Sequence, residues 1–283
     1  MTLGPSLGTM SMIPPERPPV GPEAGSLTMS LDDPCAVCRF DGAHYSMADH
    51  VGTLRSLEPR WFATIEGVDP ALLDSRVHDE ANPDGGPTLA ELGRYVQGCF
   101  DAGDAHGGGH ALHLAGRLRH SLGAGASRQV GRVVGVFASD GGVPKVAVGE
   151  AVVGYRGLEG DRQASRKHHG RVWQAICLWS ADVIEALRAE GHPIAPGCAG
   201  ENVTVADLDW PSLRPGVQLR LGSVLAEVSA YTAPCAANAA WFVDRDFHRM
   251  AHDRHPGWSR AYASVMEDGV VRVGDEAVVE PHG

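Results

Sequence analysis

The stretch Val224-Leu225-Ala226-Glu227-Val228-Ser229-Ala230-Tyr231-Thr232-Ala233-Pro234-Cys235 joins an apolar run to a cysteine that follows a proline. The run is typical of a β-strand, and a helix is expected after the cysteine. Pro234 fixes its own φ and restricts Ala233 to extended geometry, so the thiol of Cys235 leaves the strand in one direction. An unpaired cysteine usually packs inside a protein, so Cys235 by itself is only a weak indication of chemistry.

Short strand-like runs on both sides of this stretch predict a β-rich second half. They are expected at 129–137, 145–148, 172–178, 203–205, 217–221, 224–230, 261–266 and 277–279. Strands at this spacing favour a barrel or folded sheet with helices on its rim. One inserted helix is predicted at 181–190, capped by Ser180 and ended by Gly191, and a second helix at 236–250.

The first half of the chain has helical periodicity instead. Apolar residues recur at three- and four-residue steps in three segments, 46–66, 88–100 and 110–122. Three helices with loose connections predict a shortened bundle. The fold class is therefore α+β multidomain: a shortened N-terminal helical bundle followed by a β-rich, barrel-like domain, with the boundary near residue 125.

The predicted domains are a tail at 1–33, a helical region at 34–124 and the β-rich domain at 129–281. The tail is rich in proline and lacks periodicity, which predicts disorder or an extended linker.

Charge and cysteine content narrow the class of protein. The net charge is −11, and only Lys145 and Lys167 are lysines among 24 basic residues. An acidic chain without a basic block argues against nucleic acid or an anionic membrane as the main partner. The six cysteines lack disulfide-like spacing apart from Cys35-Cys38, and no apolar run reaches the length of a membrane span. The first residues do not combine a basic head with an apolar run, so we expect no secretory signal. We expect a cytoplasmic protein.

Three polar clusters lie at turns of the second half, at 157–163, 166–170 and 197–202. Glycines at such points let backbone N–H groups approach a ligand, and arginine or lysine can pair with phosphate. Taken singly, Gly160-Asp161 and Gly200-Glu201 are more simply interpreted as tight turns with charged tips.

The order of these clusters is more specific than any one of them. Along the chain come Gly157-Leu158-Glu159-Gly160-Asp161, His168-His169-Gly170, Gly200-Glu201-Asn202-Val203-Thr204, Leu219-Arg220-Leu221-Gly222-Ser223, Ala233-Pro234-Cys235 and Val271-x-x-Gly274-Asp275. This order resembles the MOSC domain, named for the C-terminal domain of the pyridoxal phosphate-linked molybdenum cofactor sulfurases. The resemblance covers roughly residues 129–281 and is strongest to the small bacterial stand-alone proteins.

The resemblance implies a β-rich barrel that binds the molybdenum cofactor, a molybdopterin. It makes Cys235 the molybdenum ligand or sulfur carrier, and His169 a catalytic residue. The cofactor-binding residues that it implies are Arg162, Arg166, Lys167, His168, Gly170, Gly200, Glu201 and Asn202. A soft thiolate suits a metal already held by dithiolene sulfurs. Glu201 and Asn202 are as consistent with holding a loop as with facing the pterin.

One loop departs from the family pattern. Family members often carry two glycines and, further along, an arginine after the histidine. Here Gly170 is followed by Arg171-Val172-Trp173-Gln174, so the cofactor contacts of this loop do not carry over residue by residue.

Two functions from different classes follow. The first is an oxidoreductase that reduces N-hydroxylated small molecules, with electrons from a separate flavin or iron–sulfur protein. The second is a sulfur carrier or cofactor-binding module in which Cys235 bears a persulfide; nothing resembles the lysine site of the fused sulfurases. A regulator whose helical half senses a ligand is a third possibility, and no sequence feature distinguishes it.

The segment Pro34–Gly42 and the helix after it resemble the start of actinobacterial DinB-like bundles. That resemblance implies a metal bound by a second-helix histidine and a paired site in the last helix, but Tyr95 occupies the second-helix position. His106 and His110 have the spacing, yet the three glycines between them predict a poor helix, and His113 and His120 lack a clear partner. We therefore expect a degenerate DinB-like region without that metal site.

Cys35-Cys38 is half of a zinc knuckle. Lacking a second cysteine pair, a four-ligand zinc site there would need His44 or His50.

Overall fold

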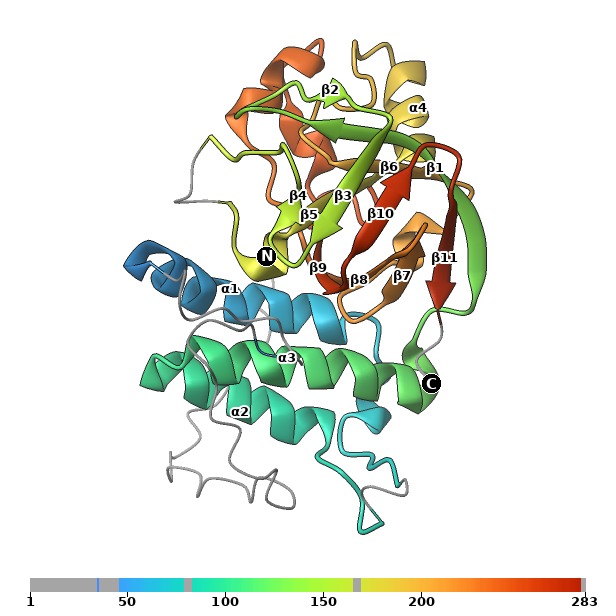
Figure 1. Ribbon diagram of the computed structural model, residues 1–283. Helices are drawn as coiled ribbons and strands as arrows, with labels where there is room; N and C mark the ends of the chain where they lie inside the picture. The colour runs from blue at the N-terminus through green and yellow to red at the C-terminus, as the bar shows by residue number, and fades with distance from the viewer. Residues whose placement is uncertain (1–34, 36–45, 79–82, 165–168, 281–283) are drawn as a thin grey trace, which may run out of the picture.

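The computed structural model describes residues 35, 46–78, 83–164 and 169–280, so the predicted tail at 1–33 lies outside the described residues. Helices occupy the first half of this range and strands the second (Figure 1). The strands are β1 Gln129–Ala138, β2 Val146–Ala147, β3 Glu150–Gly154, β4 Gly157–Leu158, β5 Ile176–Ser180, β6 Val203–Ala206, β7 Gln218–Leu221, β8 Val224–Tyr231, β9 Ala261–Glu267, β10 Gly269–Arg272 and β11 Glu276–Glu280.

Seven of these strands form a closed barrel, in the order β1-β11-β7-β8-β9-β5-β6 and back to β1. Strand β1 closes it, because Gln129–Arg132 pair with β11 while Arg132–Val136 pair with β6 across a bulge. The β5–β6 pair is parallel and the other pairs of the barrel are antiparallel. The predicted barrel-like fold is confirmed.

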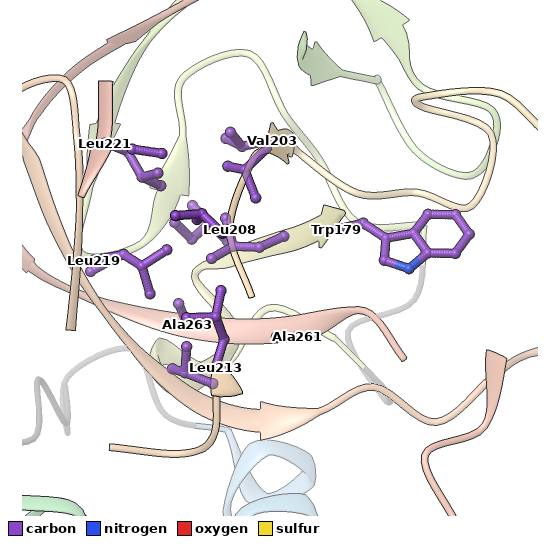
Figure 2. Close-up of a cluster of buried hydrophobic side chains, with 14 of the residues drawn as sticks. Trp179, Val203, Leu208, Leu213, Leu219, Leu221, Ala261 and Ala263 are labelled. Atoms are coloured by element: carbon purple, nitrogen blue, oxygen red, sulfur yellow. The ribbon is translucent and has the colours of Figure 1, made fainter. Parts of the chain in front are cut away.

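Side chains of alternate positions fill the barrel. Leu219, Leu221 and Val203 converge there with Leu208, Leu213 and Ala263 (Figure 2). Trp179 lies to one side, and its indole N–H donates to the carbonyl of Trp258 at 3.1 Å. This core is separate from a second cluster in the helical half, formed by Leu57, Leu89, Leu92, Val96, Cys99, Ala111, Leu112 and Ala115.

Strands β3, β4 and β10 form a small second sheet, and sequence reasoning missed all three. They are short, and glycines interrupt or border them, so no alternating pattern extends far enough to be recognised. Two other predictions were wrong in part. Residues 172–174 form a 3-10 turn before β5 rather than its start, and the helix expected at 236–250 is two 3-10 segments, Ala236–Trp241 and Phe247–Met250.

The predicted helices are present as α1 Met47–Ile65, α2 Leu89–Ala102 and α3 Ala105–Arg119, followed by an irregular turn at His120–Ala124. The inserted helix α4 spans Ala181–Ala189 behind its cap Ser180. Ser46 and Thr88 each form a capping box with the carboxylate three residues on, which fixes where α1 and α2 begin.

Helix α3 begins five residues earlier than predicted and includes the three glycines. Asp104 caps it by accepting from the N–H of Gly107 at 2.8 Å. A Cβ on Gly108 would lie 2.5 Å from Cδ1 of Leu57 on α1, so a larger residue there would force the buried Leu57 side chain to shift. Tertiary packing thus overrides the low helix propensity of glycine here.

Helices α1 and α3 pack against the barrel, with α2 on their far side (Figure 1). The imidazole of His113 on α3 lies 2.7 Å from the carboxylate of Glu227 on β8, both buried. Arg60 on α1 donates to the carbonyl of Ser229 on β8 at 3.1 Å. Among the described residues, no helix combines the length and the apolar character needed to cross a membrane.

Helix α3 and the barrel approach each other closely at two glycines, and this contact can be tested. A Cβ on Gly116 of α3 would lie 2.5 Å from Cα of Gly216. We expect Gly116→Ala to lower the free energy of unfolding by about 1–3 kcal/mol, because backbone cannot yield as a side chain can. Urea unfolding followed by circular dichroism measures it.

Gly109→Ala is the matched control, because it lies on the same helix with open space around it. We expect this variant to gain up to about 1 kcal/mol from helix propensity. Equal stability of the two variants would contradict the close packing of α3 on the barrel.

Candidate functional site

Cys235 lies just beyond the end of β8. The N–H of Thr232 donates to the carbonyl of Arg260 at 3.0 Å, which keeps the chain beside the start of β9. Cys235 then has an extended backbone and caps the 3-10 turn Ala236–Trp241, its sulfur accepting from the N–H of Ala237 at 3.3 Å. The residue is exposed. The predicted strand and proline thus present a thiol to solvent rather than to the core.

Tyr262 of β9 contacts the loop that carries His169. Its hydroxyl lies 2.9 Å from Nδ1 of His169, and the indole of Trp173 packs edge-on against its ring at 5.9 Å. Burial, reinforced by Cys177 and Cys235, raises the pKa of Tyr262 well above its usual range. The phenol therefore keeps its proton at neutral pH and can donate it in a hydrogen bond.

Arg260 is a buried cation at the start of β9. Its Nη1 donates to the carbonyl of Ala199, which ties β9 to the turn that contains Gly200. Gly200 has φ +90°, where a side chain would be strained, and its Cβ position is 3.8 Å from Nη1 of Arg260. Nε of Arg260 is buried and has no hydrogen-bond partner among the described residues.

Glu201 is fully buried beneath this turn. Its Oε1 accepts from the N–H of Gly197 at 2.6 Å and from the hydroxyl of Thr204 at 3.3 Å. Burial raises the pKa of its carboxyl, although the two donors and Arg260 act in the opposite direction. The carboxyl closes the turn from inside, so the interpretation as a charged tip on the surface was wrong.

Asn202 and Asp161 join two motifs that are far apart in the sequence. Nδ2 of Asn202 donates to the carboxylate of Asp161 at 3.0 Å, and Oδ1 accepts from the N–H of Cys177 at 3.0 Å. Lys145 completes the network with Nζ 2.5 Å from Asp161. The side chain of Asp161 is also buried, with 3% of it exposed, so it is not an exposed turn tip either. The Gly-Asp and Gly-Glu-Asn motifs meet through these contacts.

The remaining candidates are placed as follows. Arg162 is exposed and pairs with Asp140 at 3.0 Å. Gly170 has φ +84°, which a glycine adopts without strain. Arg166, Lys167 and His168 lie outside the described residues.

Sequence reasoning missed Tyr262, Arg260 and Lys145. A signal existed for two of them: Lys145 is one of two lysines in a chain whose other basic residues are arginines, and Arg260 immediately precedes an apolar run that must be buried. Tyr262 gave no signal, since its role depends on which strand lies beside which.

Helix α1 packs directly on the segment after His169, the loop that departs from the family pattern. The carbonyl of Asp49 accepts from Nε of Arg171 at 3.3 Å, and the hydroxyl of Thr53 accepts from the Trp173 indole at 3.4 Å. The Arg60 guanidinium stacks on the same indole at 4.8 Å. Arg171 and Trp173, which lie in the part of the loop that departs from the family pattern, are therefore the residues that contact helix α1.

A second group with ligating side chains lies in the helical half, formed by Cys35, His106 and His110. Cys38 and His44, proposed from the sequence as zinc ligands, lie outside the described residues. His50 is described but does not belong to this group.

Comparison with known proteins finds a match to a family model over part of the chain. Residues 165–278 match the family model described as the MOSC domain. The uncharacterized protein YflK of Bacillus subtilis (strain 168) is 30% identical over 135 residues, or 47% of this chain and 60% of that relative. The chain thus matches less than two thirds of the length of that relative.

Solved structures similar to part of the chain include two bacterial proteins. The YuaD protein from Bacillus subtilis is 18% identical with a TM-score of 0.43, covering 56% of this chain and 99% of its own. YiiM from Escherichia coli is 22% identical with a TM-score of 0.42, covering 56% and 72%.

The buried Glu201 makes a pH-dependent prediction. Because its pKa is raised in the fold, the folded state binds more protons than the unfolded state as pH rises above the unfolded value of about 4.3, and stability falls. We expect Glu201→Gln to stabilise the protein relative to wild type at pH 8, with the gain shrinking toward pH 4. Urea unfolding of both proteins across this range measures the difference.

Glu201→Ala serves as the contrasting variant. It leaves the two buried donors without an acceptor, so we expect it to lose about 2–4 kcal/mol at every pH. If Glu201→Gln were instead less stable than wild type, and most so at high pH, the fold would require the charged carboxylate.

Proposed function

We propose that this chain binds the molybdenum cofactor and reduces N-hydroxylated compounds. The proposal rests on the match of residues 165–278 to the MOSC domain family, which is related to that cofactor. Amidoximes and hydroxylamines would be converted to amidines and amines. The observation that supports the proposal best is the exposed thiol of Cys235, just beyond the end of β8.

The residues of the site fit a molybdenum pterin by their donor chemistry. An exposed thiolate is the soft ligand that the metal takes, and Cys235 supplies it without having to be uncovered. Arg260 offers a buried guanidinium whose Nε has no hydrogen-bond partner among the described residues. Arg162, Arg166 and Lys167 remain our candidates for the pterin phosphate, and His168, Gly170 and Gly200 for further contacts.

When bound, the cofactor supplies the two-electron chemistry that breaks the substrate N–O bond. For a hydroxylamine the balance is R–NHOH plus two electrons and two protons, giving R–NH2 and water. A separate flavin or iron–sulfur protein is the proposed source of the electrons. Of the chain's own residues, Cys235 holds the metal, and His169 delivers protons toward the substrate from a position fixed by Tyr262.

Glu201 and Asn202 have a narrower part in this proposal than the family resemblance implied. Both are buried in hydrogen-bond networks of the barrel rim. They hold the turn at Gly200 in place, and we propose that they affect the cofactor through that turn.

Cys235→Ala tests the proposed metal ligand. In a host that makes the cofactor, we expect wild type to contain molybdenum and pterin in similar amounts, and Cys235→Ala to lose most of the molybdenum. Elemental analysis and pterin fluorescence after oxidation measure the two components. Cys198→Ser is the control, since it alters a half-buried cysteine elsewhere. Unchanged molybdenum in Cys235→Ala would contradict the proposal.

The same exposed thiol also supports a sulfur carrier, because a protein-sized donor could reach it. Mass spectrometry after incubation with a cysteine desulfurase separates the two functions. An added sulfur on Cys235, in a protein that takes up no molybdenum, would favour the carrier. No added sulfur would exclude it.

Tyr262→Phe tests the proton path. It removes the hydroxyl 2.9 Å from His169 without emptying the core. We expect the same molybdenum content, a kcat lowered about 10- to 100-fold, and a shifted pH profile, since a positioned proton donor contributes on the order of 100-fold or more. Wild-type kcat in a fully loaded variant would show that Tyr262 only packs.

A further inference from the structure

The helical half brings together three metal-ligating side chains well apart from Cys235 in the sequence. One ligand atom each from Cys35, His106 and His110 lie within 4.8 Å of one another, and all three residues are half-buried. The two imidazoles lie one turn apart on α3, with ring centroids at 5.9 Å, as residues four apart on a helix do. Cys35 reaches them from outside the three helices.

The glycines between the histidines support this arrangement. A Cβ on Gly107 would lie 2.3 Å from Oδ2 of the cap Asp104, and one on Gly108 would strike Leu57. A larger residue at either position would force the side chain of Asp104 or of Leu57 to move, so the two glycines let the cap and α1 lie close to this part of α3. The His106–His110 face therefore lies on a fixed helix, which is the support that a metal site needs.

The ligand set differs from the one that the DinB-like resemblance implied. The second-helix position is Tyr95, whose hydroxyl hydrogen-bonds the buried thiol of Cys99. The third ligand instead comes from Cys35, about 70 residues before the histidines in the sequence. This set depends on the placement of Cys35, which no helical pattern predicts.

One thiolate and two imidazoles are the donors of a borderline divalent cation, and the group includes no carboxylate that would favour magnesium or calcium. We propose that Cys35, His106 and His110 bind a zinc ion. Tetrahedral zinc holds its ligand atoms about 3.5 Å apart, so no pair of ligand atoms in this group has to move closer by more than about 1.3 Å on binding. Three protein ligands leave the fourth position to water.

The proposed ion is a structural clip. It joins the chain at Cys35 to α3 and so closes a long loop that contains α1 and α2, which restricts the unfolded chain. The site does not involve Cys235 or the barrel, and it stands whether or not the chain binds a molybdenum cofactor.

Cobalt substitution of the full chain, prepared without the molybdenum cofactor, tests the ligand set. After chelation and dialysis, Co²⁺ should bind with one equivalent per chain. It should give a thiolate-to-cobalt charge-transfer band and the strong visible bands of a tetrahedral site. We expect Cys35→Ser to abolish the charge-transfer band, and His106→Gln or His110→Gln to weaken Co²⁺ affinity at least 10-fold.

Two matched variants serve as controls. Cys198→Ser and His248→Gln remove residues of the same types elsewhere in the chain and should leave spectrum and affinity unchanged. A band that survives Cys35→Ser, or the absence of tight Co²⁺ binding by wild type, would overturn the proposal.

Alkylation of wild type removes the risk that a variant misfolds. Zinc should slow the modification of Cys35 by iodoacetamide at least 10-fold, while the exposed Cys235 serves as internal reference. Peptide mass spectrometry reads both sites in one sample. Equal rates at Cys35 with and without zinc would contradict the site independently of the cobalt result.

Discussion

Closure of the barrel by β1 is the constraint on which the rest of the structure depends. One strand pairs with β11 through its first residues and with β6 through its later ones, with Arg132 in register with both neighbours. Closure leaves no free edge among the seven strands and fixes which strand ends meet. It places Cys177 of β5 opposite Tyr262 of β9, and Tyr262 beside the end of β8. Residues from distant motifs therefore share one rim.

The second constraint is the contact between the helical half and the barrel. Buried polar contacts such as that of His113 with Glu227 keep α3 from sliding along the barrel. If the two side chains separated, each would be a buried polar group without its hydrogen bond. Arg171 and Trp173 form hydrogen bonds with α1 and follow His169 closely in the sequence. The helical half thus helps to shape the rim loop, and its loss would affect the candidate site as well as stability.

Local signals were enough to predict the elements that depend on local physics. Apolar periodicity located the first two helices, and apolar runs located most barrel strands. The predictions failed where contacts between residues far apart in the sequence determine the local structure. The start of α3 was missed because its glycines have low helix propensity, whereas in the structure Gly108 packs against Leu57 of α1. In the site, Cys235 was recognised from the order of motifs, but the burial of Asp161 and Glu201 and the part of Tyr262 follow from strand adjacency.

The central claim is that Cys235 is the protein's ligand to molybdenum. Molybdenum K-edge X-ray absorption of the cofactor-loaded protein, compared with the Cys235→Ala protein loaded as far as it can be, tests this claim most directly. Our account predicts one more sulfur ligand to molybdenum in wild type than in the variant. The same number of sulfur ligands in both would contradict it.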